Sequence, residues 1–152
     1  MRFSTRTRYG LRFLLRLARQ DDDSLLQLGQ VAQEEEISPG YLEQIVRSLK
    51  PLNILHAVRG PTGGYMLTQQ PSQIRLDDVI ERLEGDLAPI SCLRKGKGCN
   101  RAQECSTIAF WQEFDGHLRS FLRNRTLQNL LDDGRRSGRE GGSHVGLHCD
   151  SA

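Results

Sequence analysis

The sequence lacks any long apolar run, both after the arginines at its N-terminus and along the rest of its 152 residues. A helix that spans a bilayer needs about 18 or more consecutive apolar residues, and a secretory leader needs an apolar segment behind its basic start. We therefore expect a soluble, cytoplasmic protein with no membrane partner.

A strong excess of one charge and the residue orders of common enzymes are also missing. The formal net charge is only +2, so binding to a polyanion would depend on local clusters of cations. We find neither a Ser-His-Asp order nor a phosphate-cradling glycine loop, so the sequence does not indicate an enzyme. Four cysteines in a reducing compartment indicate metal or redox chemistry rather than structural disulfides.

The sequence does contain a short amphipathic helix followed at once by a glycine-rich turn, within residues 38–65. Ser38 is a good N-cap before Pro39, and apolar residues at helical spacing predict one buried face. Polar groups on the opposite face are of the kind that read base edges in the DNA major groove. The DNA-binding residues predicted here are Ser38, Gly40, Tyr41, Glu43, Gln44 and Arg47.

The turn after this helix predicts a β-hairpin. Apolar runs at residues 54–58 and 65–67 flank the sequence RGPTGG, whose glycines permit the positive φ of a tight turn. Arg59 would lie near the tip, where a long cation can enter the narrow minor groove. Each feature alone is common on protein surfaces, but their unbroken order indicates a winged helix-turn-helix. Its predicted wing residues are Arg59, Gly60, Gly63 and Gly64.

Two helices are predicted before this reader, the first from about Thr5 to Gln20 with Ser4 as its cap, the second from Leu28 to Glu35. The first is lined with arginines, which either lie along DNA phosphates or form an ordinary solvated face. We assign Arg2 and Arg8 to DNA. The arginines of this segment are Arg2, Arg6, Arg8, Arg12, Arg16 and Arg19.

The C-terminal half is predicted to hold a short helix at 77–83 that ends at Gly85, a long helix at 106–123 and a closing helix at 126–131. Apolar residues of the long helix recur at steps of three, four and three, as in a coiled-coil seam. We expect residues 106–123 to form a homodimer interface, with simple core packing as the alternative. The seam consists of Trp111, Phe114, Leu118 and Phe121.

These elements predict a mainly α fold with a small β-hairpin wing. We expect a winged helix-turn-helix DNA-binding domain at residues 1–85 and a cysteine-rich, cluster-binding loop at 86–105. The dimerisation and closing helices would occupy residues 106–133. Residues 134–152 are rich in glycine, serine and charge, which predicts a disordered tail.

Cys92, Cys99 and Cys105 lie in the predicted loop, six and five residues apart. Zinc sites favour closer pairs, about two to four residues apart, whereas an irregular loop of thiolates can enclose an iron-sulfur cluster. Cations such as Arg94 and Arg101 would lower the thiol pKa values and balance a cluster's charge. Zinc, a thiol redox switch and inert cysteines stay open as alternatives.

Several motifs together carry a resemblance: RYGLRFLL, SPGYLEQIV, VRGPTGGY, DDVIERLEG and the three cysteines before a long helix. Over residues 1–133 the chain resembles the IscR-like family of winged-helix iron-sulfur transcriptional regulators. The resemblance implies a homodimeric regulator, expected to be a repressor, that binds pseudo-palindromic double-stranded promoter DNA. It also implies one iron-sulfur cluster per subunit on Cys92, Cys99 and Cys105, and a role for Glu43 in operator choice.

The chain departs from this family at Ile108, where IscR has a histidine ligand to its 2Fe-2S cluster. Relatives such as NsrR and RirA hold a 4Fe-4S cluster through three cysteines, some with a carboxylate at the position of Arg8. The sequence is therefore compatible with either a 2Fe-2S or a 4Fe-4S cluster. The alternative function is a regulator of cysteine or sulfur metabolism, like CymR, controlled by a protein partner or by thiol oxidation without a cluster.

Overall fold

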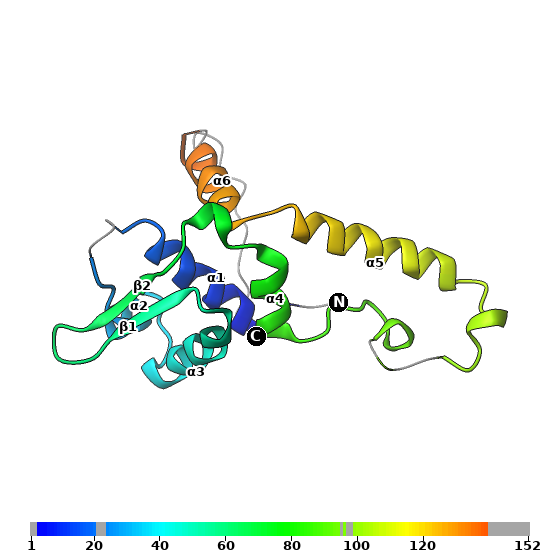
Figure 1. Ribbon diagram of the computed structural model, residues 1–152, viewed down its shortest axis with the longest axis horizontal. Coiled ribbons are helices and arrows are strands. Elements are labelled where there is room, and N and C mark those ends of the chain that lie inside the picture. The colour runs from blue at the N-terminus through cyan, green and yellow to red at the C-terminus, as the bar shows by residue number, and fades with distance from the viewer. Residues whose placement is uncertain (1–2, 21–23, 95, 97–98, 140–152) are drawn as a thin grey trace.

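The computed structural model describes residues 3–20, 24–94, 96 and 99–139, and it is mainly helical with one two-stranded antiparallel sheet (Figure 1). No helix in these residues is long and apolar enough to cross a membrane. Short 3-10 turns at Lys50–Leu52, Pro71–Gln73, Ser91–Leu93 and Ala102–Glu104 join the main elements. Those elements are α1 (Thr5–Leu17), α2 (Leu28–Glu34), α3 (Pro39–Leu49), β1 (Leu55–Val58), β2 (Gly64–Leu67), α4 (Leu76–Glu84), α5 (Ile108–Arg123) and α6 (Leu127–Arg139).

The main core lies where α1 contacts α3, α4 and β2. Phe13 and Leu14 of α1 are fully buried there, against the apolar face of α3 and Val79 of α4. Burial of such side chains contributes roughly 1.5–3 kcal/mol each, so α1 is the central support of the domain. The position of α3 therefore depends directly on α1.

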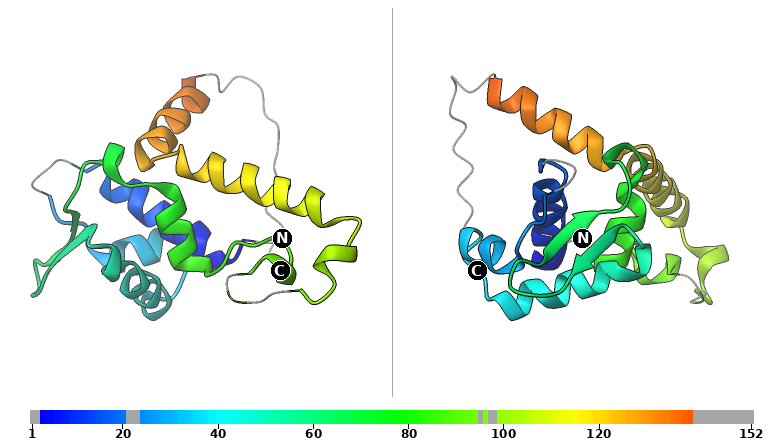
Figure 2. Two further views of the ribbon diagram at one scale, coloured as in Figure 1. Left: turned by 45° about the vertical axis from the view of Figure 1, so that its right-hand side comes forward. Right: turned by 60° about the vertical axis from the view of Figure 1, so that its left-hand side comes forward.

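A second apolar cluster connects this domain to α5. Leu76 and Ile80 of α4, Leu87 of the following segment and Leu122 of α5 are buried together. Of the α5 side chains, all of which the structure describes, Leu122 alone is buried. Figures 1 and 2 show α5 extending away from the domain, with the cysteine loop at its far end.

Two predictions about the ends of α1 are wrong. Helix α1 ends at Leu17 rather than Gln20, because the amides of Arg19 and Gln20 turn back to carbonyls three residues earlier. Ser4 precedes α1 in extended conformation, but its side chain does not cap the helix. Its hydroxyl donates instead to Glu84 at the end of α4.

Helix α6 is longer than expected and runs to Arg139, so the predicted disorder of residues 134–139 is wrong. Leu127 and Leu131 are buried and anchor its first turns. Once a helix has nucleated, each added residue costs little, so the polar segment after Leu131 continues it. The rest of the predicted tail, residues 140–152, lies outside the described residues.

Candidate nucleic-acid interface and cysteine loop

Helix α3 forms as its sequence predicts. Ser38 is extended, and its Oγ accepts a hydrogen bond of 3.1 Å from the Tyr41 amide, which confirms the N-cap. The apolar face is completely buried, while Glu43, Gln44 and Arg47 are exposed on the other side. Gly40 is exposed beside them, with nothing within 4 Å of the position that a Cβ atom would take. The buried residues are Leu42, Ile45, Val46 and Leu49.

Glu43 and Arg47 form an ion pair across one turn of α3, with the Glu43 Oε1 and the Arg47 guanidinium 2.9 Å apart. Both side chains are more than half exposed, so the pair adds little stability. The pair holds the Arg47 guanidinium toward Glu43 on the exposed face. The exposed face of α3 is therefore internally restrained.

Tyr41 does not lie on the open face where we predicted it. It is half-buried, its hydroxyl shares a hydrogen bond of 2.7 Å with Oγ1 of Thr5, and its ring packs edge-on against Tyr9. Tyr41 stands four residues before Ile45, at the border of the apolar face. Its contacts with Thr5 and Tyr9 join α3 to α1.

The hairpin after α3 pairs Leu55 with Leu67 and Val58 with Gly64. Arg59 and Gly60 lie exposed at its tip, and Gly60 has a φ of +114°, which favours glycine. Strand β2 also pairs on its other side with the segment before α2, where the amides of Leu26 and Tyr65 each donate to the other's carbonyl. The pairing with Leu26 therefore ties the hairpin, and with it the tip, to the rest of the domain.

Gly63 and Gly64 have steric roles. A Cβ atom on Gly63 would lie 2.2 Å from the Val58 carbonyl oxygen, and one on Gly64 would lie 2.7 Å from the Leu26 carbonyl oxygen. Both neighbours are backbone atoms, which cannot turn aside as a side chain can. These glycines thus set the path of the hairpin on which Arg59 stands.

Gly63→Ala should distort the hairpin and weaken DNA binding. Relief of the clash requires a backbone shift, which should cost about 1–3 kcal/mol of unfolding free energy and misplace Arg59. Gly29→Ala in α2 is the matched control, because nothing lies within 4 Å of its Cβ position. Denaturation and DNA titration of both variants measure the effect, and equal behaviour would contradict the steric role.

The arginines of α1 fall into groups that the sequence did not separate. Arg2 lies outside the described residues. Arg8 is exposed, with its guanidinium 5.3 Å from the Tyr9 ring centroid, and in the described chain it pairs with no carboxylate. Arg6 donates a 2.7 Å hydrogen bond to Oγ of Ser48, at the last turn of α3.

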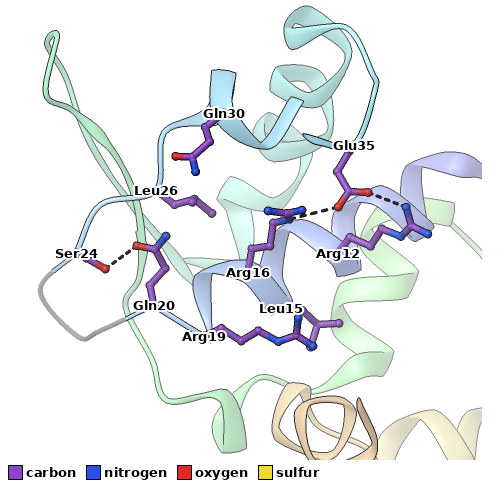
Figure 3. A pocket seen from close by; sticks show the side chains of 9 residues that line it. All are labelled: Arg12, Leu15, Arg16, Arg19, Gln20, Ser24, Leu26, Gln30 and Glu35. Carbon is purple, nitrogen blue, oxygen red and sulfur yellow. Dashed lines mark hydrogen bonds and ion pairs between the residues drawn. The ribbon is translucent and has the colours of Figure 1, made fainter. Parts of the chain in front are cut away.

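Arg12 and Arg16 point toward α2, where both guanidinium groups meet Glu35 (Figure 3). The Arg12–Glu35 pair measures 2.6 Å, and Arg16 also pairs with Glu34. Hydrogen bonds from Gln30 and Arg16 hold the pKa of Glu34 below its ordinary value. These two arginines therefore fasten α1 to α2, a role we did not predict although the EEE sequence at 34–36 offered the counter-charges.

The same ion pairs border an open cavity of about 710 Å³ between α1 and α2. Arg19 also lines it, beside the amide side chains of Gln20 and Gln30. Two of its three arginines share the carboxylate of Glu35.

The cysteine loop brings Cys92 and Cys99 together. Hydrogen bonding to Cys99 raises the pKa of the Cys92 thiol, and the nearby charge of Cys105 acts in the same direction. Hydrogen bonds from Thr107 lower the pKa of Cys105, whose Sγ lies 3.5 Å from the Thr107 hydroxyl. All three cysteines are half-buried and free.

The donor set suits an iron-sulfur cluster in its chemistry. The thiols are partly accessible, they influence one another electrostatically, and the charge of Arg101 favours the Cys105 thiolate. Among the described residues, however, no three ligating side chains already converge as a metal site. The loop supplies the ligands but does not hold them ready.

Helix α5 presents a different apolar row from the one we predicted. Phe110, Phe114 and Phe121 are strongly exposed, whereas Leu118 packs on the second core cluster. Trp111 is half-buried between Phe110 and Phe114, with ring centroids 5.1 and 6.2 Å away. The open face therefore includes Phe110, which the predicted seam left out.

A helix with an exposed polar face beside a hairpin with a basic tip defines the class of winged helix-turn-helix DNA-binding proteins. The chain belongs to the Rrf2 family, described as iron-dependent transcriptional regulators, whose model matches residues 3–133. The protein is thus a DNA-binding transcriptional regulator and not an enzyme.

Individual relatives agree. The transcriptional regulator IscR of Cronobacter sakazakii is 32% identical over 133 residues, which are 88% of this chain and 82% of the relative. The structure of CymR, the global cysteine regulator of B. subtilis, is 30% identical with a TM-score of 0.67, covering 87% of this chain and 97% of its own. IscR of T. potens is 26% identical with a TM-score of 0.68, covering 96% and 94%. These similarities confirm the winged-helix fold and the IscR-like resemblance.

Proposed function

We propose that the protein is a cytoplasmic, homodimeric repressor whose binding to promoter DNA is controlled by an iron-sulfur cluster. The observation that carries this proposal is that the loop joining the DNA-binding domain to α5 bears three free, half-buried thiols, of which Cys92 interacts with both of the others. Similarity to the IscR proteins supports it. One cluster per subunit, 2Fe-2S or 4Fe-4S, would be held by Cys92, Cys99 and Cys105.

A bound cluster would supply reversible redox chemistry and reactivity toward small oxidants. The protein's own contribution is the charge and hydrogen bonding around the thiols, above all Thr107 and Arg101 at Cys105. Ile108, which begins α5, has no ligating atom, so the chain offers three ligands here instead of four. A site with one weakly held position suits a sensor better than a structural cluster.

Protein purified without oxygen tests the cofactor. We expect a brown protein with visible absorption bands, and with iron and sulfide in equal amounts. Colourless protein that contains zinc or no metal, after reconstitution with iron and sulfide has also failed, would contradict the cluster.

For DNA, we propose that α3 enters the major groove and that Arg59 enters the minor groove beside it. Arg2 and Arg8 would contact phosphates, and two copies of the domain would read a pseudo-palindromic site. The contact surface on α3 would consist of Ser38, Gly40, Glu43, Gln44 and Arg47, with Tyr41 of the same helix bonding it to α1. Gly60 would let the tip of the wing approach the DNA backbone closely, while Gly63 and Gly64 set the path of the hairpin that carries it.

Glu43→Ala should broaden the range of DNA sequences bound rather than weaken all binding. A carboxylate repels phosphate and accepts hydrogen bonds only from base amino groups such as cytosine N4, so it rejects sites that present acceptors instead. Its removal also releases Arg47 from their ion pair. Selection from a random duplex pool measures the change, with Glu36→Ala as a control, and a uniform loss of affinity would instead make Glu43 a positive contact.

We propose that residues 106–123 form the dimer interface through the exposed aromatic face of α5. Phe110, Phe114 and Phe121 are 60%, 43% and 58% exposed, which is unusual for phenylalanine on an isolated helix. A second copy of the same face would cover them by two-fold symmetry.

Phe114→Asp should convert the dimer to a monomer, because a charge would then be buried at the centre of the interface. Sedimentation measures the mass, and circular dichroism checks the fold. Glu113→Asp is the adjacent control, since the Glu113 side chain is 74% exposed. A Phe114→Asp variant that stays dimeric would place the interface elsewhere.

The second candidate function is a regulator of cysteine or sulfur metabolism that works by thiol oxidation or a protein partner. The contact of Cys92 with Cys99 and the similarity to CymR favour it. It predicts colourless protein whose DNA affinity changes with peroxide, and the absorption measurement above separates the two.

A further inference from the structure

The start of α1 is capped by a residue from another helix. The backbone amide and the Oγ of Ser4 both donate to Oε1 of Glu84, at 2.7 and 2.8 Å. Glu84 is the last residue of α4 and lies 80 residues further along the chain. Figures 1 and 2 show the beginning of α1 beside the end of α4.

This contact is favourable for several reasons. The first amides of a helix have no acceptor within the helix, and the helix dipole attracts negative charge to that end. Burial raises the pKa of Glu84, but its hydrogen bonds and the nearby Arg6 outweigh burial and lower it. The carboxylate is therefore ionised at neutral pH and anchors the first turn of α1 to α4.

The anchored turn in turn holds α3 at both ends. Thr5 bonds to the hydroxyl of Tyr41 in the first turn of α3, and Arg6 bonds to Ser48 in its last turn. The Arg82 side chain, from α4, also donates to the Ser48 carbonyl at 2.8 Å. The exposed face of α3 lies between these two points, so its orientation follows the first turn of α1.

We propose that Glu84 is a positioning residue for DNA recognition: it touches no DNA, but it fixes the first turn of α1 and thereby the angle at which α3 meets the major groove. The inference rests on the DNA-binding function and needs no cluster. It gives Ser4 and Glu84 a role in specificity although neither lies on the surface assigned to DNA.

The direction in which DNA affinity changes when Glu84 is replaced separates positioning from a simple effect of its charge. DNA phosphates repel a carboxylate, so removing one near the binding surface should strengthen binding if Glu84 acted by charge alone. Positioning predicts the opposite, a loss confined to specific sites. Asp78→Asn removes the same charge from an exposed position of the same helix and is the matched control.

The test uses the full chain and a duplex that the wild-type protein selects from a random pool, with poly(dI-dC) as non-specific DNA. Glu84→Ala should weaken binding to the selected duplex by about tenfold, as expected for loss of a charge-assisted bond pair, and leave poly(dI-dC) binding unchanged or stronger. Ser4→Ala should weaken it less, and Ser4→Thr, which keeps the hydroxyl, should restore it. The Ser4 and Glu84 changes should not add.

Hydrogen exchange of the backbone amides of residues 4–8 should accelerate in Glu84→Ala. If that variant fails to fold, the same measurements are made on Glu84→Gln. Unchanged or tighter specific binding with an intact fold would overturn the proposal. So would additive effects of Ser4→Ala and Glu84→Ala, or equal losses on both DNAs. If wild-type protein selects no duplex at all, the DNA reader itself fails, which is a different result.

Discussion

Alanine at any one of Cys92, Cys99 and Cys105 should remove most of the visible absorption and most of the iron from protein purified without oxygen. With three protein ligands, loss of one thiolate leaves too few bonds to retain a cluster. Cys105 should be the most sensitive, because Thr107 and Arg101 already favour its thiolate. Iron, sulfide and absorbance are measured per chain, with circular dichroism as the check on folding.

Cys149→Ala is the internal control for this series. Cys149 lies in the glycine-rich C-terminal segment, outside the described residues, and ordering such a segment to add one ligand costs conformational entropy. We expect the variant to keep its colour and iron. If it bleaches like the loop variants, the three-cysteine site is wrong and the tail contributes a ligand.

Arg59→Ala should weaken binding to the selected duplex by about 1–3 kcal/mol, roughly a 5- to 150-fold loss. The residue is exposed at the hairpin tip, so the change removes no packing and the fold should persist. The expected loss combines a phosphate-facing charge with readout of groove width. Affinity is measured by titration at fixed salt, because binding to DNA depends steeply on salt.

Arg136→Ala provides the comparison for lost charge, since Arg136 is exposed on α6. Figure 1 shows α6 on the side of the molecule away from α3. It should cost much less than Arg59→Ala. Equal losses would show that only net charge matters and that the wing does not enter the groove.

The reader helix and its hairpin could be predicted because their signals are local. Ser38 and Pro39 start α3, apolar spacing defines its buried face, and Gly63 with Gly64 permits the turn. Each of these effects acts within a few residues of sequence. The prediction therefore agreed with the structure at the start of α3 and to within about a residue at the ends of both strands.

The supporting contacts could not be predicted, because they join residues far apart in sequence. Nothing local pairs Arg12 with Glu35, or Ser4 with Glu84. Tyr41 looks like a surface residue until Thr5 and Tyr9 are placed beside it. The arginine pattern of α1 thus seemed uniform in sequence, although part of it serves folding and only part remains free.

The cysteine loop shows a different limit. The spacing of Cys92, Cys99 and Cys105 indicated the ligand chemistry, but the chain alone does not gather the three into a metal site. Coordination geometry belongs to the loaded protein, and metal binding and loop ordering are coupled. On α5, the predicted seam left out the exposed Phe110, because the heptad spacing was counted from its neighbour Trp111.

The central claim is that the state of the three-cysteine loop controls DNA binding. The direct measurement is the affinity of one anaerobic preparation for the selected duplex, before and after the cluster is removed with a chelator, with Cys99→Ala as the permanently cluster-free control. We predict that removal changes the affinity by about tenfold or more, equivalent to about 1.4 kcal/mol of coupling, and that Cys99→Ala matches the treated protein. Equal affinities for the loaded, stripped and Cys99→Ala proteins would contradict the account.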